Sequence, residues 1–288
     1  MADVDVLVPT FARPAALAVT LTSLLAQSGV RLRVVVSDQT EAFDVADLGE
    51  VSAVVRVLRL NGHDVEVVKH LPRRGMAEHR QSLLDRVTAP YALFLDDDVI
   101  VEPDLAARLL SAIAAERCGF VGSFVNAPSA VRSPKPVDEP PPDVAIELWD
   151  GPVRPERVVP GSREWQRHRL HFAAYLHVVG ERLGITKERQ RLYKVAWIGG
   201  CVLFDTAALR SVGGFCFGAN LPPDHSGEDV VAQLRVMAVA GGAGLAPSGA
   251  WHQEVRTTRP RQETDAPFAL ADRLFDTSDG TATGADRG

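Results

Sequence analysis

Hydrophobic residues along the N-terminal third of the chain follow two alternating spacings. Short runs of branched apolar residues predict buried β-strands at residues 4–8, 32–36, 65–68 and 91–95. Between them, leucines recur at helical spacing in residues 15–27, and residues 76–87 show the same period. Strands that alternate with helices are typical of an α/β fold with a mainly parallel sheet.

The remainder of the chain is less regular. The pattern predicts helices near 105–116 and 163–183, a strand at 195–204, and a helix that begins at Glu228. Residues 127–160 are rich in proline, which indicates an extended insertion or loop. The polar tail from residue 259 to 288 is expected to be disordered, at least over its last dozen residues.

Composition narrows the classes of protein. Of 288 residues, 46% are hydrophobic and 24% charged, which excludes disorder throughout. A net charge of −6 disfavours nucleic acid and anionic lipid as partners. No apolar stretch reaches the length of a membrane span, and the N-terminus lacks a secretory signal, so we expect a cytoplasmic protein without an integral membrane segment.

Polar side chains follow the predicted strands, at the edge of a parallel sheet where ligands bind. Thr10 and Asp38 end the first two strands, and three consecutive aspartates, residues 96–98, end the fourth. Three adjacent carboxylates repel one another, and a hard divalent cation such as Mg²⁺ or Mn²⁺ would relieve this repulsion while bridging to substrate phosphates. A solvated acidic turn before the next helix is the alternative interpretation.

Several short motifs occur in a fixed order along the chain. They are VPTFARP at 8–14, GMAEHRQ at 75–81, LDDDVIVEPD at 95–104, GGCVLF at 199–204 with VGGF at 212–215, GEDV at 227–230 and WH at 251–252. In order and spacing, this set resembles the family-2 type of glycosyltransferases with the GT-A fold. The resemblance covers nearly the whole chain and includes the D-x-D segment of that family.

The resemblance implies a Rossmann-like GT-A fold and a metal-dependent hexosyltransferase. It places one domain at residues 1–258, with a nucleotide-sugar half at 1–98 and an acceptor half at 99–258 that carries the insertion 127–160. It further implies a nucleoside-diphosphate sugar donor with UDP, GDP or dTDP as its nucleotide, and a hydroxyl-bearing acceptor of unknown class.

The resemblance also implies roles for residues that bind the nucleotide sugar: Pro9, Thr10, Arg13, Asp38, Arg80, Asp96, Asp97, Trp197, Gly199 and Gly200. Asp38 would hydrogen-bond the base, Arg80 would meet the diphosphate, and Asp96 would reach the ribose or a metal-bound water. Trp197 with the two glycines would form a platform for the sugar. The alternatives are an Asx turn for Asp38, a solvated helix arginine for Arg80 and a core aromatic for Trp197.

Other residues are expected to bind the metal ion and to take part in catalysis. Asp98 and His252 are the expected ligands of Mn²⁺ or Mg²⁺, although a lone histidine is often structural. Asp229 is expected to act as the general base, with Glu228 orienting the acceptor, in a displacement that inverts the anomeric centre. Carboxylates in a first helical turn also complement the helix dipole without any catalytic role.

Other functions remain as alternatives. A retaining glycosyltransferase and a catalytically silent nucleotide-sugar-binding homologue share the same motifs. A phosphatase with an Asp-x-Asp nucleophile would place that motif after the first strand, which residues 96–98 do not follow. A Rossmann dehydrogenase is disfavoured because no G-x-G-x-x-G follows the first strand, and a sugar nucleotidyltransferase because no glycine-rich basic loop does.

Overall fold

Strands and helices alternate from the N-terminus, as the hydrophobic pattern predicts. The structure is a computed structural model that describes residues 2–132, 145–171, 175–258 and 264–276. Its first elements are β1 (Val4–Thr10), α1 (Pro14–Leu24), β2 (Leu32–Asp38), η1 (Val45–Asp47), α2 (Gly49–Leu60), β3 (Asp64–Lys69), α3 (Met76–Leu84), β4 (Tyr91–Leu95), β5 (Val99–Val101) and α4 (Leu105–Glu116). The pattern did not predict α2.

Shorter elements make up the rest of the described chain. They are β6 (Phe120–Gly122), β7 (Val125–Asn126), α5 (Pro128–Arg132), η3 (Glu164–His171), α6 (Tyr175–Arg182), β8 (Arg191–Tyr193), β9 (Cys201–Asp205), α7 (Thr206–Ser211), η4 (Cys216–Asn220), β10 (His225–Ser226), α8 (Glu228–Ala240), β11 (Gly242–Ala246), β12 (Ala250–His252), β13 (Thr264–Asp265), α9 (Ala266–Ala269) and η5 (Ala271–Arg273).

One large sheet holds the molecule together. Its strand order is β3-β2-β1-β4-β9-β6-β11-β8, with parallel pairing among β3, β2, β1 and β4 and between β6 and β11. β9 is antiparallel to both of its neighbours, and β8 is antiparallel to β11. The predicted α/β fold with a mainly parallel sheet is therefore confirmed. A three-stranded sheet, β5-β12-β7, lies beside it.

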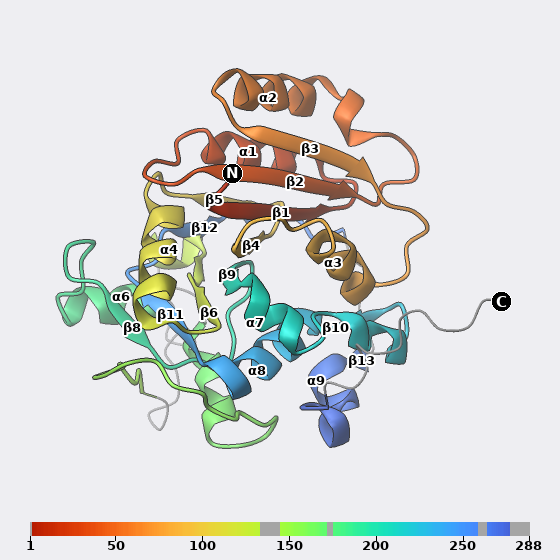
Figure 1. The fold of residues 1–288 in the computed structure, drawn as a ribbon. Helices are drawn as coiled ribbons and strands as arrows, with labels where there is room; N and C mark the ends of the chain where they lie inside the picture. The colour runs from red at the N-terminus through yellow and green to blue at the C-terminus, as the bar shows by residue number, and fades with distance from the viewer. Residues whose placement is uncertain (1, 133–144, 172–174, 259–263, 277–288) are drawn as a thin grey trace.

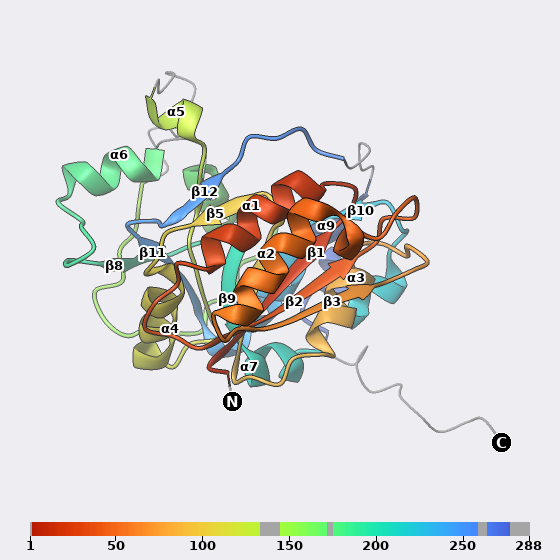
Figure 2. The same ribbon diagram turned by 90° about the horizontal axis from the view of Figure 1, so that it is seen from above.

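Helices cover both faces of the large sheet (Figure 1). Alternate residues of β1 point to opposite faces, so Val6 belongs to the core that includes residues of α1, α2 and α4, whereas Leu7 belongs to the core that includes residues of α3, α7 and α8. Seen from above, α1 and α2 lie over the strands (Figure 2). Both faces are buried, which explains why the residues of β1 are apolar almost without alternation.

Three expectations differ from the structure. The helix expected at 163–183 is the 3-10 helix η3 followed by the separate helix α6. The strand expected at 195–204 begins only at Cys201, because Gly200 has a φ of +77° and interrupts the extended backbone. Residues 264–276 of the expected disordered tail form β13, α9 and η5, and bury Leu270 and Leu274 against the core.

Some expectations concern residues that the structure describes only in part. Residues 133–144 of the proline-rich insertion, and residues 259–263 and 277–288 of the tail, lie outside the described residues. Within the described part, none of the helices is both long and apolar enough to cross a membrane.

Candidate functional site

The three aspartates after β4 face different partners. Asp97 is buried, and its carboxylate accepts hydrogen bonds from the Thr10 hydroxyl at 2.6 Å and from the Arg13 guanidinium. Asp98 also pairs with Arg13, at 2.6 Å. Asp96 is the most exposed of the three and lies 3.3 Å from Arg80. The end of β1 and the end of β4 are thus joined directly, as expected for neighbouring parallel strands.

Arg13 neutralises part of this acidic cluster. It precedes Pro14 at the start of α1, and its guanidinium bridges Asp97 and Asp98. Burial raises the pKa of Asp97 to about 6, and Arg13 and Thr10 act against that rise. The repulsion that we expected a divalent cation to relieve is partly relieved by the protein itself.

The β5-β12 pair brings His252 beside Asp98. His252 is opposite Val99 in the antiparallel register, and the backbone N–H of Gln253 donates to the Asp98 carbonyl at 2.9 Å. Nδ1 of His252 accepts the Glu254 N–H at 2.7 Å, and Nε2 lies 3.4 Å from the Asp98 carboxylate. The two residues predicted as metal ligands, far apart in sequence, therefore lie next to each other.

This pair suits a metal in its chemistry but does not enclose one. Among the described residues, no three His, Cys, Asp or Glu side chains form a group that could hold a metal ion. One carboxylate and one imidazole are ligands that Mn²⁺ accepts, and Mg²⁺ and Mn²⁺ commonly take one or two protein ligands together with substrate phosphates. Asp98 and His252 fit such a shared site.

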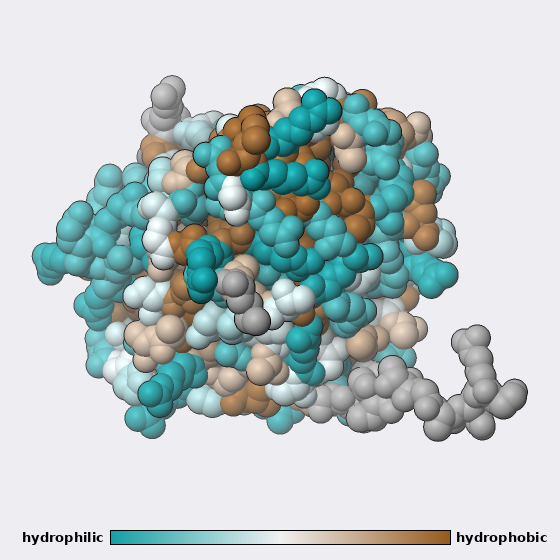
Figure 3. All heavy atoms as spheres, turned by 45° about the horizontal axis from the view of Figure 1, so that its top comes forward, coloured by the Kyte–Doolittle hydropathy of each residue, from teal (hydrophilic) through white to brown (hydrophobic). Residues whose placement is uncertain are grey.

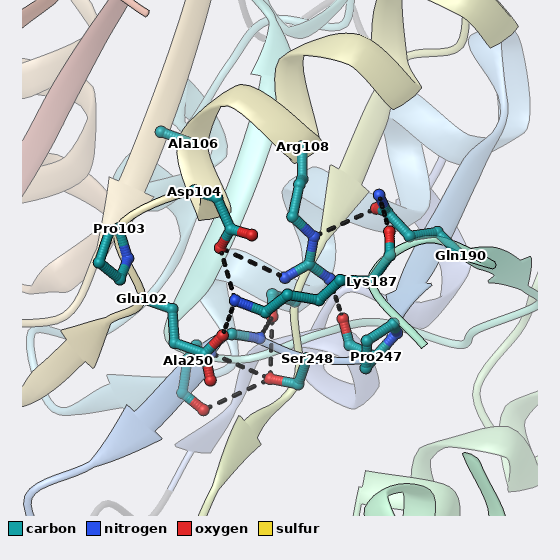
Figure 4. A network of polar contacts seen from close by, with 12 residues as sticks. Glu102, Pro103, Asp104, Ala106, Arg108, Lys187, Gln190, Pro247, Ser248 and Ala250 are labelled. Atoms are coloured by element: carbon teal, nitrogen blue, oxygen red, sulfur yellow. Dashed lines mark hydrogen bonds and ion pairs between the residues drawn. The ribbon is translucent and has the colours of Figure 1, made fainter. Parts of the chain in front are cut away.

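A polar network supports the turn that leads into β12 (Figure 4). Buried Arg108, on α4, donates to the carbonyl of Pro247 and to Gln190 at 3.2 Å. Beside it, Lys187 pairs with Glu102 at 2.7 Å, and Glu102 also accepts a hydrogen bond from Trp251 at 3.0 Å. The network links the segment after the aspartates to the strand that carries His252.

Arg80 joins three elements beneath the aspartates. It is buried on α3, and its Nε donates to Glu228 at 2.9 Å while Nη2 reaches Asp96 at 3.3 Å. These carboxylates, with Asp229, raise the pKa of Arg80. The structure places this side chain, which is expected to meet a diphosphate, between the end of β4 and the start of α8.

The start of α8 holds the two carboxylates expected to act on the acceptor. Glu228 is 2% exposed, and Asp229 is half-buried. Burial and the adjacent charge of Glu228 raise the pKa of Asp229 to about 6, while Arg80 lowers it. Such a carboxylate is protonated more readily than an exposed one, which is the property that a general base near neutral pH requires.

Gln233 fixes α8 to the segment that precedes β9. Its amide accepts from the Ile198 N–H and donates to the Ile198 carbonyl, both at 2.8 Å. Gly200 follows, and its carbonyl accepts the Asp96 N–H at 2.9 Å. Gly200, Arg80 and Asp229 line the same small cavity. Asp96 is therefore held beside Gly200 by a backbone hydrogen bond, and the Gln233 side chain ties α8, which carries Asp229, to the same segment.

Trp197 directly precedes Ile198 of this segment and contacts other rings. The His168 imidazole is stacked on its indole with centroids 4.9 Å apart, and Trp165 is tilted against it at 4.6 Å. Phe268 of α9 adds an edge contact to Trp165. These contacts favour the core interpretation of Trp197 over the sugar platform, while Gly199 beside it stays exposed.

A cleft of about 310 Å³ opens beside the aspartates, at the carboxyl ends of β1 and β2. Of the predicted residues, it is lined by Pro9, Thr10, Arg13 and Asp97. The sequence reasoning missed other residues of its lining, chiefly Phe11, Gln39, Arg73 and His79. Arg73 lies over the Phe11 ring at 3.7 Å. Phe11 and Gln39 directly follow Thr10 and Asp38, the last residues of β1 and β2. Their position just after a strand is the sequence signal that could have indicated that they line the cleft.

Asp38 itself is enclosed. It has no exposed surface, and its carboxylate accepts from the Thr40 N–H at 2.8 Å, the Val45 N–H at 3.3 Å and Lys69 at 2.7 Å. The first of these contacts is the Asx turn that we gave as the alternative to base recognition. The carboxylate organises the loop after β2.

A mainly parallel sheet with carboxylates and a cleft at the carboxyl ends of its strands is typical of α/β proteins that bind their ligands at that edge. The sequence matches the family described as "Glycosyl transferase family 2" over residues 5–172, more than half of the chain. The protein belongs to this family. A comparison with curated proteins gave no match.

Solved structures share the fold at low sequence identity. TarS from S. aureus is 14% identical, with a TM-score of 0.57, and the match covers 87% of this chain and 36% of that chain. TarS 1-349 in complex with UDP-GlcNAc is 13% identical, with a TM-score of 0.56, and the match covers 89% of this chain and 60% of that chain. Mannosyltransferase PcManGT from Pyrobaculum calidifontis, in complex with GDP-Man and Mn²⁺, is 17% identical with a TM-score of 0.52 over 96% and 71%. The chain thus spans between about a third and two thirds of the TarS chains it matches.

Proposed function

We propose that the protein is a metal-dependent glycosyltransferase that moves a sugar from a nucleoside-diphosphate donor to an acceptor hydroxyl with inversion. The observation that carries the proposal is the link through Arg80, which joins the exposed member of the acidic cluster, Asp96, to the carboxylate pair on α8. Family membership and the ligands named for the similar structures, UDP-GlcNAc, UDP and GDP-Man, support a nucleotide-sugar donor.

In this proposal one domain, residues 1–258, carries both substrates. The cleft beside β1 and β2 takes the nucleotide, and the region around Gly200 and α8 takes the donor sugar and the acceptor. Asp98 and His252 would hold Mn²⁺ or Mg²⁺, which supplies positive charge beside the diphosphate when bound. Mn²⁺ in the mannosyltransferase structure supports this choice of ion.

Asp229 acts as the base. Its carboxylate takes the proton of the acceptor hydroxyl as the acceptor oxygen forms a bond to the anomeric carbon. The bond from that carbon to the diphosphate oxygen breaks at the same time, and its electron pair leaves with the nucleoside diphosphate. Glu228, fixed by Arg80, keeps the start of α8 in place and orients the acceptor. General-base assistance of this kind contributes about 10²–10⁴-fold to the rate.

Nucleotide binding provides the first test. Thermal denaturation and calorimetry with UDP, GDP and dTDP, each with and without Mn²⁺, are compared for the wild type and Asp98→Ala. A ligand at about 100 times its Kd stabilises the fold by about 2.7 kcal/mol. We expect one nucleotide to bind in a metal-dependent manner and Asp98→Ala to lose that dependence. If none of the three binds, the glycosyltransferase proposal fails.

The stereochemistry needs a separate measurement. NMR of the product formed from the identified donor reports its anomeric configuration. Inversion predicts the configuration opposite to that of the donor sugar. A product with the donor's own configuration would assign a retaining mechanism and remove Asp229 from its role as base.

A further inference from the structure

His225 is a buried histidine between the nucleotide cleft and the start of α8. It is 1% exposed, it begins β10, and it lies three positions before Glu228. Pro223 and Asp224, which directly precede it, line the cleft. The segment 223–229 thus runs from the wall of the cleft to the two carboxylates on α8, and the imidazole is held between them.

Both ring nitrogens of His225 make hydrogen bonds, one within its own loop and one to another helix. Nδ1 lies 2.6 Å from the Pro222 carbonyl oxygen, and Nε2 lies 3.0 Å from the backbone nitrogen of Ala77 on α3. A carbonyl only accepts and a backbone N–H only donates, so Nδ1 carries the hydrogen and Nε2 is the acceptor. The two contacts together require a neutral imidazole with its hydrogen on Nδ1.

The bond to Ala77 caps α3 from a distant part of the chain. Gly75 is the N-cap residue of α3, and it has no side chain that could accept a hydrogen bond from the first turn. Its φ is +109°, and a Cβ there would lie 2.7 Å from Cε1 of His225, so the glycine leaves the space that the imidazole occupies. His225 supplies the acceptor that a serine or aspartate at the N-cap position normally provides.

A second contact joins the same two segments. Arg80 lies one turn along α3 from Ala77, and its Nε donates to Glu228 at 2.9 Å. The same helix presents His79 to the cleft. The helix that borders the nucleotide cleft is thus joined at two points to the segment that leads into α8, and His225 makes the contact at the first turn.

We propose that His225 is a positioning residue, which acts through its cap on α3 to place Asp229 relative to a donor bound in the nucleotide cleft. Loss of the Nε2 acceptor would release the first turn of α3 from the segment 222–225 and let the carboxylate move. A displacement of about 1 Å near the reacting atoms can lower a rate about 100-fold. The inference rests on the proposed function, because it assumes that Asp229 is the base and that the cleft holds the nucleotide.

Two substitutions separate the two hydrogen bonds. In His225→Gln the amide oxygen can take the place of Nε2 and accept from the Ala77 N–H. In His225→Asn the shorter amide can take the place of Nδ1 and donate to the Pro222 carbonyl, but it does not extend to α3. The inference therefore predicts that glutamine, and not asparagine, preserves the placement of Asp229.

Turnover and nucleotide affinity are measured separately. Turnover is the release of nucleoside diphosphate from UDP-, GDP- and dTDP-sugars with Mn²⁺ present, and calorimetry with the free nucleotides gives their Kd. We expect kcat of His225→Asn to fall about 10–100-fold, because only the reacting geometry changes, while the nucleotide Kd stays within about threefold. His225→Gln should keep kcat within about threefold of the wild type.

The titration of Asp229 provides a measurement that needs no turnover. NMR of the side-chain carboxyl carbon follows the pKa of Asp229, which burial raises to about 6 in the wild type. A displaced carboxylate is more exposed, so His225→Asn should lower this pKa towards the ordinary 3.8, and His225→Gln should leave it unchanged. An unchanged pKa in His225→Asn would overturn the inference.

Arg210→Met is the matched control, because Arg210 caps the opposite end of the same helix. Its guanidinium donates to the carbonyls of Leu84 and Val87 at 3.0 and 2.9 Å. We expect Arg210→Met and His225→Asn each to lower the melting temperature by about 2–4 °C. Only His225→Asn should change kcat and the pKa of Asp229. Equal losses of kcat in these two variants would reduce His225 to a structural cap and reject its positioning role.

The remaining outcomes separate this inference from the proposed function. If His225→Asn does not fold, ¹⁵N NMR of the wild-type histidines decides, because a His225 ring with its hydrogen on Nε2 would overturn the inference. A loss of kcat in His225→Gln as large as that in His225→Asn would also overturn it. If the folded wild type binds no nucleoside diphosphate, the proposed function fails, and the titration of Asp229 still decides whether His225 places that carboxylate.

Discussion

At the scale of single residues, Asp229 is a carboxylate whose surroundings oppose its ionisation. Burial and the charge of Glu228 raise its pKa from the ordinary 3.8 to about 6. A base must be ionised to accept a proton, so the same surroundings that make it a stronger base also limit the pH range in which it acts. A functional carboxylate of this kind is retained at some cost in stability.

The activity of the wild type should therefore fall below pH 6, by about tenfold per pH unit, as Asp229 becomes protonated. Rates measured with saturating donor between pH 5 and 8 check this profile. Asp229→Asn should lose activity at every pH. Residual activity that still follows an ionisation near pH 6 in Asp229→Asn would show that another group acts as the base.

As the pH rises, the contribution of Asp229 to stability should fall, whereas its contribution to activity rises. Because the folded-state pKa lies above the unfolded value, ionisation favours the unfolded chain, and Asp229 lowers the free energy of unfolding increasingly from about pH 4 to pH 6. Asp229→Asn should thus be more stable than the wild type above pH 6, and this gain should vanish below pH 4. Urea denaturation at several pH values measures the difference.

Gly199 and Gly200 are adjacent, and they offer a matched pair of positions for substitution by alanine. Gly200 has a φ of +77°, and a Cβ there would lie 3.0 Å from Val125 and 3.4 Å from the Asp96 carboxylate, whereas a Cβ at Gly199 has nothing within 4 Å. Gly200→Ala should cost about 1–2 kcal/mol. Gly199→Ala should stay within about 0.5 kcal/mol. Equal melting temperatures for the two variants would contradict this account.

At the scale of elements, short segments position the site through contacts between distant parts of the chain. β12 carries His252 and is only three residues long, and its register against β5 sets the distance to Asp98. The turn before β12 is anchored by Arg108 from α4. Elements of this length are stabilised by tertiary contacts more than by local propensity.

The network in Figure 4 offers a comparison between a buried and an exposed cation. Arg108 is 7% exposed and donates hydrogen bonds to the Pro247 carbonyl and to the Gln190 side chain. Arg108→Met should therefore lower the free energy of unfolding by about 1–3 kcal/mol. The Lys187 side chain is 44% exposed, and Lys187→Met should cost less than about 1 kcal/mol. Chemical denaturation gives both values, and a larger loss for Lys187→Met would contradict the role given to Arg108.

Sequence pattern predicted elements where the local signal is strong. Helix α4 has the expected bounds because its apolar residues recur regularly after Pro103 and Asp104. β11 was missed because its sequence, GAGLA, lacks β-branched residues. Its glycines make room for rings: a Cβ at Gly242 would lie 2.2 Å from the Phe120 ring, and a Cβ at Gly244 would lie 2.2 Å from the Tyr193 ring. No local pattern reports such an approach from another strand.

The site was predictable in its residue types but not in its pairings. Position after a strand indicated Thr10 and the aspartates, and the sheet does bring them together. Arg80 and Glu228 are 148 positions apart in the sequence, and Arg13 and Asp97 are 84 positions apart. The charge pattern alone could therefore not show that these two arginines pair with carboxylates of the protein. Nor could it show that the Asp38 carboxylate accepts a hydrogen bond from Lys69, 31 positions away.

At the scale of the whole molecule, the large sheet is continuous from β3 to β8, and its middle strands are covered on both faces. The face in Figure 3 is mainly hydrophilic, with hydrophobic side chains in separate groups among polar ones. Burial is concentrated around β1, β4 and β9, and the edge strand β3 is partly exposed. Stability is therefore unevenly distributed over the molecule.

Hydrogen exchange should follow this distribution. Backbone amides of β1, β4 and β9 should exchange most slowly, because they are released only when the whole sheet opens. Amides of the edge strand β3 and of the two-residue pair β10-β13 should exchange faster. Mass spectrometry of deuterium uptake measures these rates for each segment. Equal protection of β13 and β4 would show that the small pair opens together with the sheet.

The position of β9 between β4 and β6 also affects when the large sheet can be completed during translation. Translation completes β4 at residue 95, when its partner β1 is already made, but its other partner, β9, ends only at residue 205, more than a hundred residues later. Until then the growing chain carries an apolar strand with an open edge, of the kind that pairs with other chains. The ribosome thus delivers one flank of the central sheet, β3-β2-β1-β4, long before the strand that joins it to the other flank, whose β11 follows later still. Chaperones that shield strand edges would be needed most in that interval.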